Sequence, residues 1–166
     1  NERETSIDEK RSIYKSILEL ANKTYFLDNS NFEIVEIISK CYLELFSLLP
    51  LELKYNKENF QYMLLSFQFS EKIYKTLYFD NQVIREHIKK LIKISEYYIY
   101  NKDFENLLKQ YLNIVDFTQN ILDTKNSSPE IRNIYLKYLA LVIQSFEIKG
   151  DYDKTFYYSD ILLKYT

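Results

Sequence analysis

The sequence predicts an all-α protein, and three observations support that prediction. The chain of 166 residues contains one Gly and two Pro, whereas an all-β fold of this length needs turn residues about every ten positions. Apolar residues recur at intervals of three and four along nearly the whole chain, which is the periodicity of amphipathic helices. Hydrophobic residues make up 46% and charged residues 28% of the chain, a composition typical of a globular domain with its own core.

Seven helices are predicted, joined by corners of a few residues. They are expected at about 8–26, 32–49, 58–77, 82–100, 104–122, 129–150 and 152–165. Pro50 interrupts the pattern after the second helix, because proline cannot continue a helix and restrains the residue before it. Short corners make successive helices antiparallel neighbours. We therefore expect one helical repeat domain over residues 1–166, with an N-terminal helix at 1–28 and helix-turn-helix pairs at 30–78, 82–123 and 128–166.

Helix ends carry the clearest local signals. In the run Asn126-Ser127-Ser128-Pro129-Glu130, a Ser is expected to cap the next helix, with Pro129 in the first turn, where no backbone donor is needed. Gly150 is expected to end that helix in the left-handed conformation.

Apolar stripes predict which helix faces are buried. The expected core positions are Ile13, Ile17, Leu20 and Ala21 in the first helix, Ile34, Ile37, Ile38, Cys41, Leu45 and Leu48 in the second, Leu91, Ile94 and Tyr98 in the fourth, and Leu139, Val142 and Phe146 in the sixth.

Composition excludes several classes of function. Lys and Arg number 22 against 24 Asp and Glu, a net charge of −2, so the chain has no basic excess for a phosphate backbone and we expect no direct nucleic-acid binding. Cys41 and His87 are the only residues of their types, which excludes an intrachain disulfide and any cluster of Cys or His metal ligands. One Gly cannot build a phosphate-binding loop. No cofactor, metal or membrane span is expected, the last because no apolar run reaches about 18 residues.

Single residues that could carry chemistry have simpler structural interpretations. His87 stands in a polar stretch without a recognisable nucleophile pattern, so we expect a surface or half-buried histidine. Cys41 lies among apolar residues and is expected to be a buried structural thiol. The Lys89, Lys90 and Lys93 run is flanked by acids at helical spacing and is expected to form a solvated, mixed-charge face.

The acids Asp151 and Asp153 and a neighbouring tyrosine pair also have simple structural interpretations. Asp151 and Asp153 open a helix, where acids favour the helix dipole, and are not expected to bind a metal. In the pair Tyr157-Tyr158, neighbours on a helix point about 100° apart, so one ring is expected to face the core while the other need not.

Two segments repeat one corner pattern. Residues 98–107 and 146–155 both run from an aromatic residue through a corner to Asp, an aromatic residue and an acid, with an offset of 48 (151 minus 103). The run from Phe146 to Thr155, with its Gly150-Asp151-Tyr152 corner, resembles the middle of a tetratricopeptide repeat. Ile143, Ser159 and Leu162 depart from that family's pattern, and the repeat is longer than the usual 34 residues. The resemblance implies a right-handed array of stacked helix pairs that binds peptides or proteins without catalysis.

Such an array would present a binding groove on the first helix of each pair. A stripe two positions away from the core stripes of the fourth and sixth helices defines the expected groove residues. They are Lys89, Glu96, Tyr100, Lys137, Gln144 and Glu147.

Two alternatives remain open at this point. Elongated repeats of this type resemble the peptide-sensing part of bacterial helix-turn-helix regulators, and an N-terminus without Met is compatible with removal of a preceding DNA-binding domain. An enzyme on a helical bundle is the other alternative, although no catalytic motif supports it. The expected partner is a protein or peptide, self-association into a homodimer stays open, and a cytoplasmic location is expected because no hydrophobic signal stretch is present.

Overall fold

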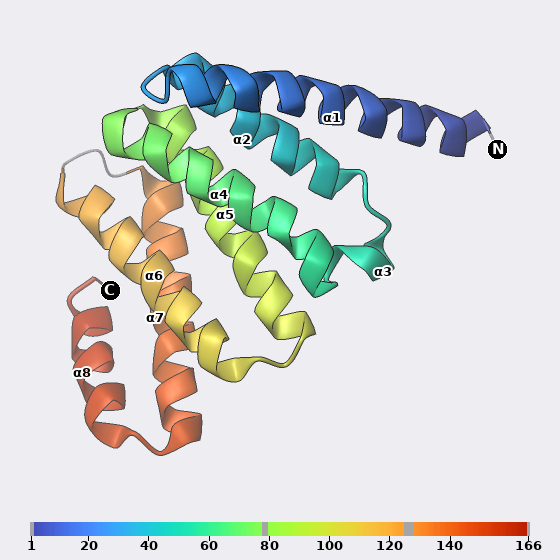
Figure 1. Ribbon diagram of the computed structural model, residues 1–166. Coiled ribbons are helices and arrows are strands. Elements are labelled where there is room, and N and C mark those ends of the chain that lie inside the picture. Colours follow the sequence, from blue (N-terminus) through green and yellow to red (C-terminus); the bar gives the residue numbers. More distant parts are fainter. Residues whose placement is uncertain (1, 78–79, 125–127, 166) are drawn as a thin grey trace. The chain divides into compact units, whose positions relative to one another are not determined.

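The structure, a computed structural model, describes residues 2–77, 80–124 and 128–165. These described residues form α-helices without a single strand, which confirms the all-α prediction (Figure 1). The helices are α1 (Glu2–Leu27), α2 (Phe32–Ser47), α3 (Leu51–Lys54), α4 (Lys57–Leu77), α5 (Asn81–Tyr100), α6 (Phe104–Asp123), α7 (Pro129–Lys149) and α8 (Tyr152–Leu163). The seven predicted helices are all present, and α3 is one additional turn that begins directly after Pro50.

Side-chain caps explain why the helices begin where the sequence indicates. Asn31, Asp103, Ser128 and Asp151 each accept a hydrogen bond from a backbone N–H in the first turn of the following helix. Such a cap satisfies one of the backbone donors that a helix start leaves without an intrahelical partner. Ser128 is therefore the predicted cap of α7, whereas the predicted turn positions 126 and 127 lie outside the described residues.

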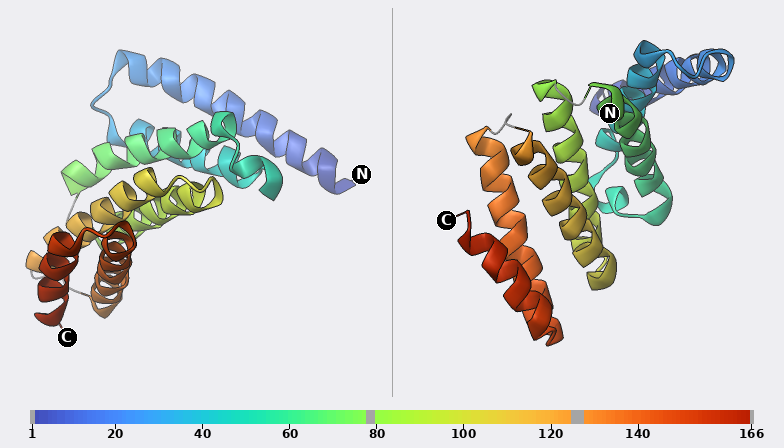
Figure 2. Two further views of the ribbon diagram at one scale, coloured as in Figure 1. Left: turned by 90° about the horizontal axis from the view of Figure 1, so that it is seen from below. Right: turned by 90° about the vertical axis from the view of Figure 1, so that its left-hand side faces the viewer.

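The chain divides into two compact units, residues 1–97 and 98–166. In the first unit, α1 packs on α2 and α2 packs on α4, with the short α3 against α4. In the second unit, α6 packs on α7 and α7 packs on α8, and Figure 2 shows these helices from two further sides. Each unit thus brings helices that are close in sequence together as neighbours.

The two corners of the second unit share one backbone geometry. Lys102 and Gly150 both have positive φ, at 54° and 72°. The N–H of Asp103 donates to Tyr98 O and the N–H of Asp151 donates to Phe146 O, each at 3.0 Å. The offset of 48 residues therefore exists in the structure of the corners as well as in their sequence. The tetratricopeptide resemblance of the whole chain stays a prediction.

The predicted core stripe of α7 is confirmed, and that of α5 is confirmed for Leu91 and Ile94. Leu91 and Ile94 are buried in the first unit, and Leu139, Val142 and Phe146 are buried in the second. Tyr98 is half-buried. In α2, Ile38, Cys41 and Leu45 are buried, whereas Ile37 is exposed.

The prediction for the first helix is wrong for three of its four residues. Ile13, Ile17 and Leu20 have exposed fractions of 57%, 40% and 68%, and only Ala21 is buried. A neighbouring face of α1 packs on the unit instead. Its Arg11 donates to Leu48 O, the backbone carbonyl at the end of α2, at 3.0 Å.

Candidate functional site

An open cleft of about 490 Å³ lies among α6, α7 and α8 in the second unit. Its lining combines apolar and charged side chains, with the buried apolar ones at its base. The lining residues are Leu108, Leu112, Phe146 and Tyr158, with Glu105, Lys109, Lys149, Asp151 and Lys154. The repeated corner builds one end of the cleft, because Gly150 turns the chain between Lys149 and Asp151.

Stacked aromatic rings form the base of the cleft. The Phe146 ring, 5% exposed, stacks on the Tyr158 ring with centroids 5.6 Å apart and an interplanar angle of 6°. Tyr157 is exposed while Tyr158 is half-buried, as predicted for this pair. Lys154 Nζ lies 5.1 Å from the centroid of the Phe146 ring and 2.8 Å from Asp151 Oδ2. The cleft therefore offers an aromatic surface next to the ammonium group of Lys154.

The rim carries three lysines and two carboxylates. Lys109 pairs with Glu105 at 2.7 Å, and this hydrogen bond is the main cause of the lowered pKa of Glu105, with a weaker contribution from the charge of Lys149. Among the described residues, Lys149 has no ion-pair partner of its own. The rim is positive by one charge, and Lys149 is the ammonium group best placed to receive an external anion.

The six residues predicted to form a groove do not line this cleft. Lys89 is exposed and pairs with Glu86 at 2.9 Å, and Glu96 pairs with Lys93 at 2.8 Å. Both belong to the first unit.

The other four predicted groove residues, Tyr100, Lys137, Gln144 and Glu147, are exposed in the second unit. Lys137 Nζ lies 5.6 Å from the ring centroid of its neighbour Tyr138. That all six residues form one groove stays a prediction.

A buried polar cluster occupies the first unit, where α2, α4 and α5 meet. Ser39 Oγ donates to Ser66 O at 2.9 Å and Ser66 Oγ donates to Ser39 O at 2.8 Å, so each hydroxyl reaches the backbone of the other helix. Lys90 Nζ donates to Ser39 Oγ at 2.7 Å. Lys90 is 5% exposed, and burial lowers the pKa of its ammonium group to about 8. The predicted solvated face is thus correct for Lys89 and Lys93 and wrong for Lys90.

His87 is also buried, with an exposed fraction of 3%, which corrects the expectation of a surface or half-buried histidine. Its ring lies against Phe67 and Tyr74, with centroids 4.8 and 5.2 Å away. Its Nδ1 lies 3.4 Å from Ser70 Oγ. Burial, and secondarily the charge of Lys90, lowers the pKa of His87 to about 4, so the imidazole is neutral near pH 7.

The cluster sets an amine of lowered pKa beside a serine hydroxyl, but near pH 7 the amine is charged and donates to that hydroxyl rather than accepting its proton. An amine of lowered pKa next to a hydroxyl is an arrangement that activates serine nucleophiles. Ser39 is only 2% exposed, and its hydroxyl proton is already donated to Ser66 O. The arrangement therefore links α2, α4 and α5 by hydrogen bonds and does not present a reactive oxygen.

Cys41 is a buried thiol, as predicted. Burial is the main cause of its raised pKa, so the thiol is poorly reactive. Over the described ranges, no group of three or more His, Cys, Asp and Glu side chains is arranged to hold a metal ion. Asp151 and Asp153 lie at the start of α8, as predicted, and the side chain of Asp151 also caps that helix.

The sequence pattern did not identify the cleft or the buried cluster. One available signal was the repeated corner, because Lys149, Asp151 and Lys154 all flank it. For the cluster, Ser39, Ser66 and Lys90 are far apart in sequence and only the packing brings them together.

None of the helices in the described ranges is both long and apolar enough to cross a lipid bilayer. Comparison with known proteins found no match to a family model, to a curated protein or to a solved structure.

Proposed function

We propose that this chain is a non-catalytic binding domain whose second unit holds a short protein segment in the cleft among α6, α7 and α8. The observation that carries this proposal is the combination of stacked aromatic rings with the ammonium group of Lys149, which has no ion-pair partner within the part of the chain that the structure describes. Small sites of this kind gain affinity from buried apolar contact and orientation from a few polar groups.

The cleft chemistry defines the kind of segment that fits. An aromatic or aliphatic side chain would cover the Phe146 and Tyr158 rings, and a neighbouring carboxylate would pair with Lys149. The acids Glu105 and Asp151 lie beside Lys109 and Lys154 and offset their charges, so these two lysines attract a second anion less than Lys149 does. We therefore expect short peptides in which an acidic residue lies next to an aromatic or large aliphatic one.

A random peptide library displayed on phage, selected against the chain of residues 1–166, tests this proposal. Selected peptides are then synthesised with a fluorophore, and their dissociation constants are measured by fluorescence polarisation. Lys149→Glu is expected to weaken binding about tenfold or more, equivalent to about 1.4 kcal/mol of binding free energy.

Lys137→Glu is the matched control, because it makes the same charge change at an exposed position of the same helix outside the cleft. It is expected to leave the dissociation constant within about twofold of the wild-type value. Loss of binding in Lys137→Glu but not in Lys149→Glu would contradict the cleft and favour the surface predicted from the sequence. Failure to select any peptide would contradict the binding function itself. A peptide-sensing role within a regulator would use the same binding step, so the selected peptides test that alternative too.

A further inference from the structure

The side of α1 that does not pack on α2 carries a regular apolar row. We call Ile13, Ile17, Leu20, Thr24 and Leu27 the α1 stripe. Their spacing alternates between four and three residues, which is the spacing of the seam of a coiled coil. The four aliphatic members are exposed, with fractions from 40% at Ile17 to 84% at Leu27. A helix that presents such a seam to water has the surface that a second helix buries.

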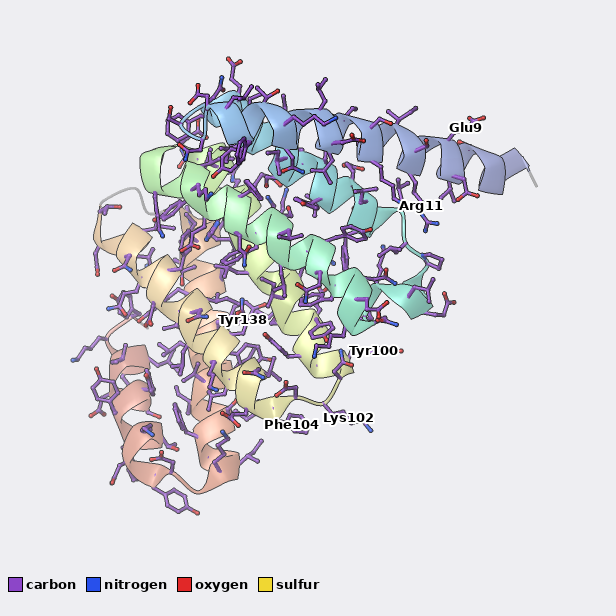
Figure 3. All side chains as sticks on the ribbon, viewed as in Figure 1. Glu9, Arg11, Tyr100, Lys102, Phe104 and Tyr138 are labelled. Carbon is purple, nitrogen blue, oxygen red and sulfur yellow. The ribbon has the colours of Figure 1, made fainter. Side chains whose placement is uncertain are left out.

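One flank of the α1 stripe carries charges of opposite sign at its two ends. Glu9, Ser16 and Lys23 follow one another at intervals of seven residues, so they share one side of the helix. Glu9 points away from Arg11, which contacts the end of α2 (Figure 3). Lys23 pairs with Glu19 of its own helix at 2.8 Å, and both side chains are about 70% exposed. Such an exposed pair contributes little and leaves Lys23 able to exchange partners.

We propose that the α1 stripe is the interface of a homodimer in which α1 packs antiparallel against α1 of a second copy. Glu9 and Lys23 lie seven residues before and after Ser16. An antiparallel pairing that sets the two copies of Ser16 side by side, close to the two-fold axis, therefore also sets each Glu9 beside Lys23 of the second copy, which gives two ion pairs from one symmetric contact. In this register Ile13 packs against Ile17 of the second copy, at the centre of the seam.

The same residues disfavour a parallel pairing. A parallel pairing sets each seam residue opposite its own copy. The seam spacing continues from Ile13 back to Lys10, so two ammonium groups would face each other. In the antiparallel register, Lys10 instead lies near Leu20 of the second copy, where its aliphatic stem covers apolar surface. This inference concerns the first unit and is independent of the cleft in the second.

Sedimentation velocity of the chain over a wide concentration range, together with a cross-linking pair, tests the interface. Ser16→Cys brings two thiols together at the proposed axis, and a short bismaleimide is expected to convert this variant to a covalent dimer. Lys15→Cys is the control, because Lys15 is exposed on a side of α1 away from the α1 stripe. The native Cys41 is buried and does not compete. A monomer at all concentrations, or equal cross-linking of both variants, overturns the proposal.

A charge exchange tests the register. Glu9→Lys and Lys23→Glu each set like charges opposite one another and are expected to weaken dimerisation about tenfold. The double variant restores opposite charges and is expected to return the dissociation constant to within about threefold of wild type. Leu20→Glu is expected to abolish the dimer while leaving the circular dichroism spectrum unchanged, because Leu20 is 68% exposed within one copy. A double variant no tighter than the singles, or a dimer that survives Leu20→Glu, refutes the proposed contact.

Discussion

Replacing Lys90 by Met is expected to stabilise the protein near pH 7. Lys90 carries a positive charge in the buried cluster of the first unit, where its ammonium group has the hydroxyl of Ser39 at 2.7 Å and Ser66 O at 3.5 Å. The long-range charges around it oppose one another, since Glu86 and Glu36 raise its pKa while Lys40 lowers it. Burial, without a close carboxylate to offset it, is therefore the main influence on the pKa of Lys90. Met keeps the length of the apolar stem and removes the charge.

The magnitude follows from the pKa of Lys90. Burial lowers it from an ordinary value of 10.5 to about 8, and each factor of ten in proton affinity is about 1.4 kcal/mol. The charged form thus costs roughly 3 kcal/mol of folding free energy. Loss of the hydrogen bond to Ser39 offsets about 1 kcal/mol of the gain. Lys90→Met is expected to raise the free energy of unfolding by about 2 kcal/mol at pH 7, within the range measured when buried charges are replaced by apolar residues.

The pH dependence has a defined sign. Below about pH 8, Lys90 carries its proton in both the folded and the unfolded state, so the difference between variant and wild type is constant. Between about pH 8 and 10.5, the unfolded state keeps the proton and the folded state loses it. The stability of the wild type therefore rises with pH over this window. The advantage of Lys90→Met is expected to shrink and then to reverse.

The difference in free energy of unfolding between Lys90→Met and the wild type is measured by urea unfolding at pH 7, 8, 9 and 10, monitored by far-ultraviolet circular dichroism. Tyrosine ionisation affects both proteins and cancels in the comparison, including that of Tyr135, whose pKa burial raises to about 12. Lys89→Met is the matched control, because Lys89 is an exposed neighbour, and a change within about 0.5 kcal/mol is expected. A Lys90→Met protein less stable than wild type at pH 7, or parallel pH profiles for the two proteins, would refute the reasoning.

Three further predictions concern single side chains. The free energy of unfolding of the wild type should fall by up to about 3 kcal/mol as the pH falls from 6.5 to 4. The pKa of His87 is lowered to about 4, so in this window only the unfolded state binds the proton. The free energy of unfolding of His87→Phe, measured with urea, should not show this fall from His87. Phe146→Ala is expected to cost roughly 3–5 kcal/mol through the loss of a buried ring stacked on Tyr158, and a melting temperature within a degree of wild type would contradict that packing. Gly150→Ala should destabilise the protein by about 1 kcal/mol because φ is 72° at that corner. Lys102→Gly should stabilise it by a similar amount, because φ is 54° there. In thermal unfolding, the melting temperature should therefore fall for the first variant and rise for the second.

Local signals predicted the helices well because their physical causes are local. Ser128 caps α7 and Gly150 ends it in the left-handed conformation, as the sequence indicates. The corner at Lys102 shows the limit of such signals, since it adopts the same geometry without a glycine. There the repeat, rather than the residue type, was the informative feature.

Burial was harder to predict because it depends on which surface covers a face. The first helix has two apolar faces about 100° apart, one with Ile13, Ile17 and Leu20 and the other with Leu18 and Ala21. Periodicity cannot choose between them, and the structure buries Ala21 but leaves the three aliphatic residues of the first face exposed.

Lys90 illustrates a second reason why burial was hard to predict from the sequence. Its burial requires an acceptor from another helix, and Ser39 supplies it from a position 51 residues away in sequence. The cleft likewise combines side chains of three helices, so its residues share no pattern along the chain.

The most direct test of the binding function is hydrogen–deuterium exchange of the chain with and without a selected peptide. Peptide bound in the cleft is expected to slow exchange in the first turns of α6 and around the corner between Lys149 and Lys154, while residues 8–27 of α1 remain unchanged. Slowed exchange confined to the first unit, or an unchanged pattern at saturating peptide, would contradict a binding site among α6, α7 and α8.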